Sequence, residues 1–213
     1  PERALRAGDA LCSLVPDAGH LIHMPTHIDV LCGNYKDVID RNEIATIADR
    51  KYLAREGAIN YYSLYRCHNY HFKTYGAMFL GQFGPALEAA EDMAAAISED
   101  LLRVESPPMA DWLEAFVSIK LHVYIRFEKW QEIITTPLPS DQKLYCVTTA
   151  MLHYAKAVAY AASFNVPAAE KEARLFEEAL ARVPESRCLF NNTSLDILAV
   201  AAEMMKGEIE YRK

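Results

Sequence analysis

The sequence predicts an all-α protein, and three observations carry this prediction. Apolar residues recur at spacings of three and four rather than two, which is the period of an amphipathic helix. Glycine is sparse, with 8 residues among 213, whereas alanine, leucine and glutamate are abundant. With 52% hydrophobic residues, a chain of this length can bury a substantial core.

Turn signals set the ends of the predicted helices. The first helix, 2–14, is already in progress at the start of the chain, and Gly33-Asn34 separates the next two, 18–32 and 35–55. The segment from Gly81 to Pro85 divides 66–82 from 84–98, and Ser106-Pro107-Pro108 precedes 108–126. Pro137 to Pro139 separates 128–135 from 142–163, and Pro184 separates 166–182 from 191–211.

One turn pattern recurs along the chain and indicates internal repeats. Leu31 to Ile39 lies over Phe79 to Leu87 at an offset of 48 residues. Both segments contain an apolar helix end, a glycine, an aromatic residue two positions later and an apolar pair. Arg126 to Ile134 is a weaker third copy, and Ser163 to Ala169 is a fourth. Each copy is interpreted as the tight turn of a helical hairpin.

These turns resemble those of the tetratricopeptide repeat family, in which a glycine precedes an aromatic residue and small residues lie at the helix crossing. The matching positions are Gly33 with Tyr35, Gly81 with Phe83, Trp130, Ala86, Ala90, Ala157 and Ala169. The resemblance covers most of the chain, although the spacings of about 48, 47 and 36 exceed the family period of about 34. It implies a right-handed α-solenoid of about four to five hairpins, forming a single domain over residues 1–213. We expect this domain to be part of a longer protein.

Histidines are concentrated in the segment Gly19 to His27. On a helix, His20, His23 and His27 share one face, and His68 and His71 repeat the first spacing. The same offset of 48 residues aligns His20 with His68 and His23 with His71, so the two pairs occupy equivalent repeat positions. In addition, His20-x-x-His23-Met24-Pro25-Thr26-His27 followed by Gly33-x-Tyr35 resembles a largely uncharacterised group of longer tetratricopeptide-type proteins, which implies no activity.

The family resemblance further implies that the first helix of each hairpin lines a concave groove. The histidines would then face that groove together with Tyr75, and His122 would occupy the position of His27 in a later repeat. Tyr65 flanks the second histidine pair, and Glu208 is a further candidate for the groove.

Neutral imidazole is the commonest metal-binding side chain and suits Zn, Cu, Fe and Ni. The sequence therefore predicts a transition-metal site formed by His20, His23, His68 and His71, with His27 and His122 as outer candidates. Two alternatives remain open: hydrogen-bonding histidines in the core or groove wall, and a metal-free polar pocket for a peptide or small anion. No catalytic residue is identified, because His20-Leu21-Ile22-His23 lacks the glutamate and the spacing of the H-E-x-x-H zinc-protease motif. No nucleotide cofactor is indicated.

Pro25 lies within the histidine segment and allows two interpretations. It either kinks one helix, because it removes a backbone N–H and presses on the carbonyl of Leu21, or it starts a new helix. We favour the kink, since the equivalent segment from His68 to Tyr75 contains no proline. Asp29 lies about 180° from His20 around the helix, so we expect it to face away from the site.

Composition limits the remaining possibilities. The net charge of -7 comes from mixed charges without a basic stripe, which argues against a nucleic-acid partner. Five cysteines without C-x-x-C spacing and the lack of a long apolar run predict a cytoplasmic protein without a membrane partner. The leading hypothesis is a metal-binding scaffold that supports metal-dependent chemistry; the alternative is a module that holds a peptide, protein or small molecule in its groove. Metal-free catalysis by histidine ranks below both.

Overall fold

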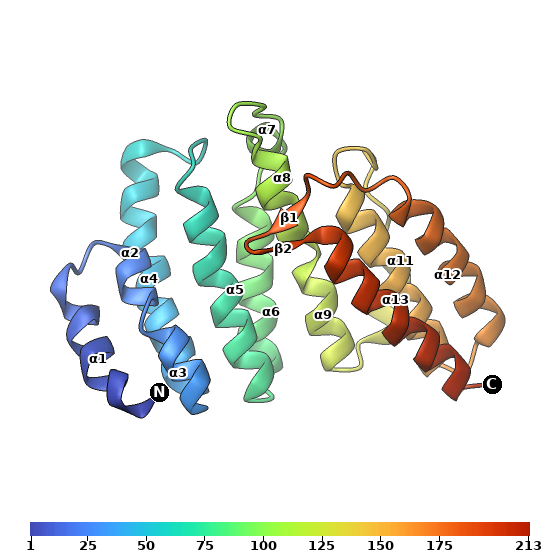
Figure 1. Cartoon of the computed structure of the whole chain (residues 1–213), viewed down its shortest axis with the longest axis horizontal. Helices are drawn as coiled ribbons and strands as arrows, with labels where there is room; N and C mark the ends of the chain where they lie inside the picture. Colours follow the sequence, from blue (N-terminus) through green and yellow to red (C-terminus); the bar gives the residue numbers. More distant parts are fainter. The chain divides into compact units, whose positions relative to one another are not determined.

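The computed structural model describes the whole chain, residues 1–213, and confirms the all-α class (Figure 1). The α-helices are α1 Leu5–Leu14, α2 Gly19–His23, α3 Thr26–Cys32, α4 Tyr35–Glu56, α5 Ser63–Phe79, α6 Phe83–Ala95, α7 Glu99–Leu102, α8 Met109–Leu113, α9 Ile119–Arg126, α10 Trp130–Thr135, α11 Cys146–Ala162, α12 Val166–Leu180 and α13 Ser194–Tyr211. Two 3-10 helices, η1 Glu2–Ala4 and η2 Glu114–Ser118, precede α1 and α9. None of these helices combines the length and the apolar character needed to cross a bilayer.

The structure departs from the predicted elements in four places. The predicted helix 18–32 is divided into α2 and α3, and the predicted helix 108–126 is divided into α8, η2 and α9. The short helix α7 was not predicted. Neither was the antiparallel hairpin of β1 Cys188–Leu189 and β2 Asn192–Thr193, in which Cys188 pairs with Thr193. Two-residue strands carry too little alternation for a period of two to be recognised.

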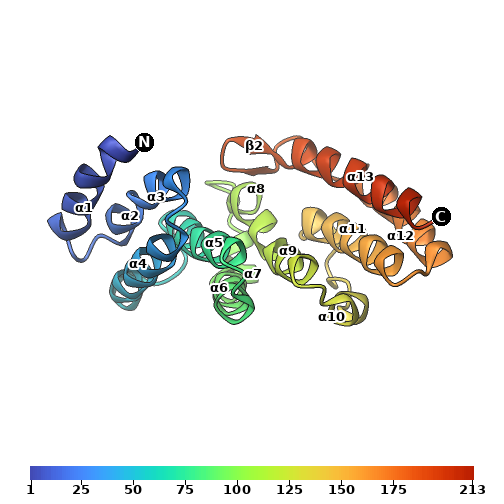
Figure 2. The same ribbon diagram turned by 90° about the horizontal axis from the view of Figure 1, so that it is seen from below.

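The chain divides into two compact units, Pro1–Leu101 and Leu102–Lys213, whereas the sequence interpretation treated it as a single array. In the first unit α2 packs against α4, α4 against α5 and α5 against α6. In the second unit α11 packs against α10, α12 and α13 (Figure 2). The core of the second unit is rich in alanine along α11, where Ala150, Ala155 and Ala157 are fully buried.

The four turns aligned in the sequence share one backbone conformation. The residues at the turn position are left-handed, with φ of 76° at Gly33, 69° at Gly81, 56° at Glu128 and 59° at Phe164. In each turn two backbone hydrogen bonds close the preceding helix, the pattern of a Schellman C-cap. The pairs are Gly33→Val30 and Asn34→Asp29, Gly81→Met78 and Gln82→Ala77, Glu128→Ile125 and Lys129→Tyr124, and Phe164→Ala161 and Asn165→Tyr160. Each turn therefore connects the two helices of one hairpin, two hairpins in each unit.

The first unit owes the position of its histidines to the close packing of α2 on α4. Ile22 of α2 is buried against Ala45 and Ala48 of α4. Gly19 is necessary for this approach, because a Cβ atom there would lie 2.1 Å from Oδ1 of Asp49 and 2.6 Å from the carbonyl oxygen of Ala45. The contact turns His23, four residues further along, towards the interior.

Candidate metal centre

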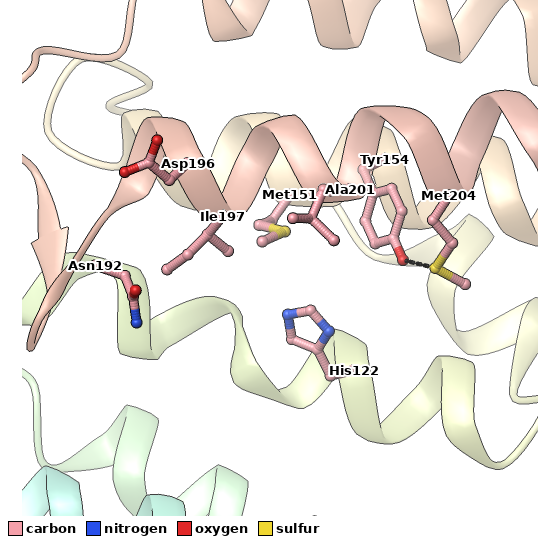
Figure 3. Close-up of a pocket in the computed structure, with 9 residues that line it drawn as sticks. His122, Met151, Tyr154, Asn192, Asp196, Ile197, Ala201 and Met204 are labelled. Atoms are coloured by element: carbon pink, nitrogen blue, oxygen red, sulfur yellow. Dashed lines mark hydrogen bonds between the residues drawn. The ribbon is translucent and has the colours of Figure 1, made fainter.

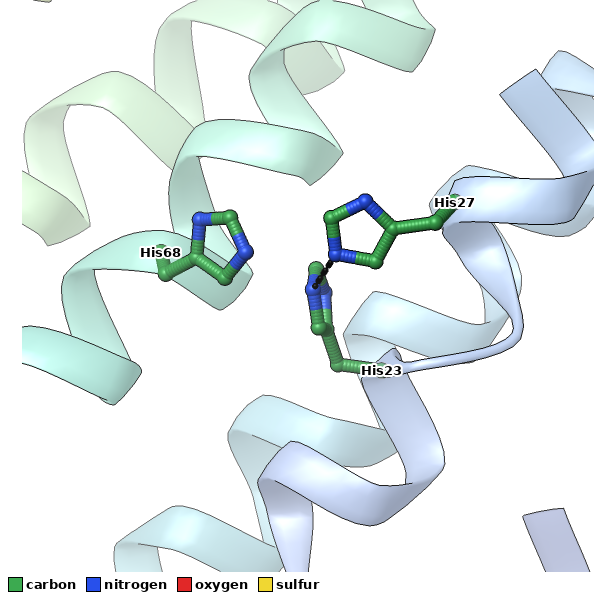
Figure 4. Close-up of side chains that lie close together, drawn as sticks. All are labelled: His23, His27 and His68. Carbon is green, nitrogen blue, oxygen red and sulfur yellow. Dashed lines mark hydrogen bonds between the residues drawn. The ribbon is translucent and has the colours of Figure 1, made fainter. Parts of the chain in front are cut away.

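Three imidazoles converge in the first unit, from three different helices (Figure 4). His23 comes from α2, His27 from α3 and His68 from α5, and one ring nitrogen of each lies within 4.8 Å of the others. The closest pair is Nε2 of His23 and Nε2 of His27, 3.1 Å apart. Ligands of tetrahedral zinc lie about 3.3 Å apart at bonds of 2.0–2.1 Å. The His23–His27 pair is therefore already at ligand spacing, and His68 needs to approach by about 1.5 Å.

Pro25 lies at the boundary between α2 and α3, and His23 and His27, four residues apart, lie on either side of it. Hydrogen bonding is interrupted between α2 and α3, yet Met24 and Pro25 both keep right-handed helical dihedrals, with φ of -50° and -59°. The backbone therefore keeps helical dihedrals through Pro25, although α3 is hydrogen-bonded as a separate helix from Thr26. The two imidazole rings lie edge to face, with centroids 4.9 Å apart.

The tautomer of His23 follows from its contact with α4. Nδ2 of Asn42 donates a hydrogen bond to the carbonyl oxygen of Val38 at 2.7 Å, so its Oδ1 is the atom that meets Nδ1 of His23, also at 2.7 Å. Because an amide oxygen only accepts, Nδ1 of His23 carries the proton. Nε2 is left with its lone pair, directed towards His27. The same relationship, in which an outer partner fixes the ring nitrogen that faces the ion, is typical of metal-binding histidines.

Burial keeps the imidazoles neutral, as metal binding requires. His23 is fully buried and His68 is 9% exposed. Desolvation is the main cause that lowers the pKa of His23 to about 3 and that of His68 to about 2, with smaller contributions from neighbouring histidines. Burial lowers the pKa of His27 in the same direction. The Phe72 ring contributes to this desolvation, since its centroid lies 4.8, 4.5 and 4.8 Å from those of His23, His27 and His68.

His20 lies beside the three histidines without belonging to the closest set. Its ring stacks on His23 at 5.4 Å and contacts Tyr65 at 4.4 Å. Burial lowers its pKa, and an interaction with Asn69 partly opposes that effect. Asn69 in turn donates from Nδ2 to Oδ2 of the buried Asp49 at 2.8 Å, while its Oδ1 is buried without a hydrogen bond. An asparagine therefore accompanies both histidines of α2.

The other predicted residues of the first unit border this cluster. His71 contacts the Phe72 ring edge at 6.5 Å, and Tyr75 packs between Phe72 and Phe79 with 37% of its surface exposed. The predicted four-ligand set of His20, His23, His68 and His71 is thus not the closest one, because His27 replaces His20 and His71. Asp29 faces away as expected and pairs with Arg41 at 3.1 Å.

The remaining predicted residues lie in the second unit. His122 is on α9, where it lines a pocket of that unit, and Glu208 is on α13, where it accepts a hydrogen bond from Arg212 at 2.9 Å. Their predicted place in a common groove with the histidine cluster stays a prediction. His153 of the second unit is buried, and its Nδ1 lies 2.7 Å from Oε2 of Glu172.

Sequence reasoning missed Asn42, Asn69 and Phe72. One signal for Asn42 was available, since it lies within a predicted amphipathic helix, one turn after Val38 and three residues before Ala45, both buried. A polar side chain that is buried on such a helix face needs a hydrogen-bond partner, and for Asn42 that partner is His23. Phe72 carried no signal, because aromatic residues at helical spacing usually pack in a core.

Comparison with known proteins gives no family assignment: no family model, no curated protein and no solved structure matches the chain. The candidate function therefore depends on the geometry of the site alone.

Proposed function

We propose that the chain is a helical-repeat scaffold that binds one transition-metal ion through His23, His27 and His68. The observation that carries this proposal is the 3.1 Å approach of Nε2 of His23 to Nε2 of His27, with Nδ1 of His23 held as a donor by Asn42. The contact is a hydrogen bond in the metal-free protein, and it also holds the two ring nitrogens at the spacing of ligands to one ion. Once the proton of His27 has moved to Nδ1, two lone pairs would converge on one point, as a cation requires.

The metal-free hydrogen bond between the two rings supports the same conclusion. Since Nε2 of His23 has no proton, His27 must donate from Nε2. Metal binding then requires the His27 proton to move to Nδ1, so that both Nε2 atoms can coordinate. His27 is half-buried and solvent can mediate this exchange, whereas His23 needs no change.

Three protein ligands leave a fourth position for water, as in catalytic rather than structural zinc sites. No carboxylate belongs to the cluster, so a bound hydroxide or anionic ligand would compensate the charge of a divalent ion. His20, whose ring stacks on that of His23, would be the neighbouring group able to accept a proton from such a water. Zinc, copper, iron and nickel share the preference for imidazole ligands.

The scaffold itself is proposed to be a right-handed α-solenoid of tetratricopeptide type. The four Schellman turns of identical hydrogen-bond pattern and the packing of hairpins within each unit support it. In this arrangement the histidines lie on the first helices of successive hairpins, where the groove would be.

An aromatic strip favours a second function, the binding of a peptide or protein without metal. From Phe72 the contacts continue through Tyr75 to Phe79 and Tyr35, at centroid distances of 6.5, 4.5 and 4.9 Å. Tyr75 and Phe79 are 37% and 53% exposed, and exposed aromatic side chains are frequent anchors for partners.

Elemental analysis for zinc, copper, iron and nickel on protein without a polyhistidine tag tests the first proposal. We expect one equivalent of metal in the parent, and in a His71→Gln variant that leaves the three ligands intact. His27→Gln and His68→Gln should lose it. A parent that holds no metal after incubation with each ion and desalting refutes the proposal. Equal loss in His71→Gln would instead show a different ligand set.

A further inference from the structure

A second candidate site lies entirely within the second unit and is independent of the histidine cluster. A pocket of about 520 Å³ opens between α9, α11 and α13 (Figure 3). This volume is within the range of about 300–1,000 Å³ that is usual for small-molecule sites. His122 extends from α9 towards the side chains of α11 and α13 across the pocket.

The lining is mainly apolar and well suited to an aromatic ring. Met151 and Tyr154 of α11 face Ile197, Ala201 and Met204 of α13. Methionine sulfur contacts aromatic rings favourably, and methionine adapts its shape to a ligand. At the rim, Met204 is 48% exposed, so part of this apolar surface is in contact with water until a ligand covers it.

Two polar groups of the pocket lack strong partners. Burial lowers the pKa of His122, and no hydrogen bond opposes this effect, so the ring is neutral and offers a lone pair. The Tyr154 hydroxyl donates only to Sδ of Met204, at 2.7 Å. A thioether is a weak acceptor, so a ligand oxygen or nitrogen in its place would accept a stronger hydrogen bond from the Tyr154 hydroxyl.

A small cavity adjoins the pocket at His122. It measures about 20 Å³ and is bordered by His122 and Ser194. Oγ of Ser194 is fully buried and makes no hydrogen bond within the protein. The lining of this cavity is almost entirely apolar, so neither nitrogen of His122 gains a partner there and the imidazole stays available to the pocket.

We propose that this pocket binds an uncharged or cationic aromatic compound that donates a hydrogen bond to His122. Asp196 is the only carboxylate among the lining residues, and it accepts from the Thr193 hydroxyl at 2.6 Å. Its negative charge favours a ligand amine and disfavours a ligand carboxylate. An indole ring, with one N–H and no charge, is the simplest probe of this chemistry.

Titration of the full chain with indole, followed through the methionine methyl signals by NMR, tests the proposal. The signals of Met151 and Met204 should shift in a saturable way, whereas those of Met78 and Met93 in the first unit should not. Val200 is 72% exposed at the pocket rim, so Val200→Arg should fold normally and weaken indole binding at least about tenfold. Ala199→Arg places the same charge on the adjacent exposed position outside the lining and should bind as the parent does.

Three analogues test the proposed recognition. Tryptamine should bind at least as tightly as indole, while 1-methylindole, which lacks the donor, and indole-3-acetate, which carries a negative charge, should bind more weakly. His122→Phe keeps an aromatic ring but no acceptor, so it should remove the difference between indole and 1-methylindole. The proposal is wrong if indole causes no saturable shift, if Val200→Arg binds normally, or if indole-3-acetate binds best. Chelation of metal should change none of these results.

Discussion

Acidification should destabilise the metal-free protein through His23 and His68. Both side chains are buried and uncharged, with pKa values lowered to about 3 and about 2, against about 6.5 in an unfolded chain. Between pH 6.5 and the folded pKa, the unfolded state binds protons that the folded state cannot. The free energy of unfolding therefore falls as the pH falls through this window, and is unaffected well above pH 7.

The size of the effect follows from the same values. Each such histidine contributes a slope of about 1.4 kcal/mol per pH unit once the pH is below 6.5. Between pH 7 and pH 5 the loss is about 2 kcal/mol for each group, or about 4 kcal/mol for His23 and His68 together. This is a large part of the 5–15 kcal/mol that usually separates folded from unfolded domains.

Urea unfolding followed by circular dichroism at pH 7, 6 and 5, with a chelator present, measures this dependence. His68→Gln removes one titrating group. Between pH 7 and pH 5 the free energy of unfolding of this variant should therefore fall by about 2 kcal/mol less than that of the parent. Phe79→Leu lies on the same helix, contacts none of these histidines and removes no proton site, so it should keep the parent slope. Contributions from other groups, such as Asp49 and Glu114, are common to all three proteins and cancel. If the free energy of unfolding depended on pH in the same way for the parent and for His68→Gln, the buried, neutral state of His68 would be refuted.

Three further changes test other parts of the structure. Asn42→Leu removes the acceptor that fixes the His23 tautomer and should weaken zinc binding by about 10–100-fold in a calorimetric titration. Gly19→Ala places a Cβ atom 2.1 Å from the Asp49 carboxylate and should lower the free energy of unfolding by about 2 kcal/mol or more, whereas Gly84→Ala, with open space around it, should not. Gly33→Ala puts alanine at a φ of 76° and should lower the free energy of unfolding by about 1 kcal/mol, as measured by thermal unfolding.

The turns were predictable because their signals are local. Gly33 and Gly81 lie at left-handed positions where glycine is favoured, and the aromatic residue two positions later begins the next helix. The copies at Glu128 and Phe164 were weaker in sequence because both positions adopt the same conformation without glycine. Alignment to the stronger copies nevertheless placed them correctly, since the hydrogen-bond pattern is set by the backbone.

The histidine site was only partly predictable, because helical spacing describes one helix at a time. The repeated H-x-x-H pairs identified the correct region and four of the five histidines around it. Which three converge depends on the packing of α2, α3 and α5, which places His27 of α3 3.1 Å from His23. The offset of 48 residues predicted symmetry between the two H-x-x-H pairs, whereas the closest set takes one histidine from each pair and adds His27.

The packing of α2 on α4 explains why His23 is the centre of the cluster. Gly19, Ala45 and Ala48 allow the helices to approach closely, and this approach buries His23 against Asn42. The same contact that stabilises the fold therefore removes water from the imidazole, fixes its proton on Nδ1 and directs Nε2 towards His27. For the proposed metal site, substitutions along α4 that disturb this packing should alter metal affinity without touching a histidine.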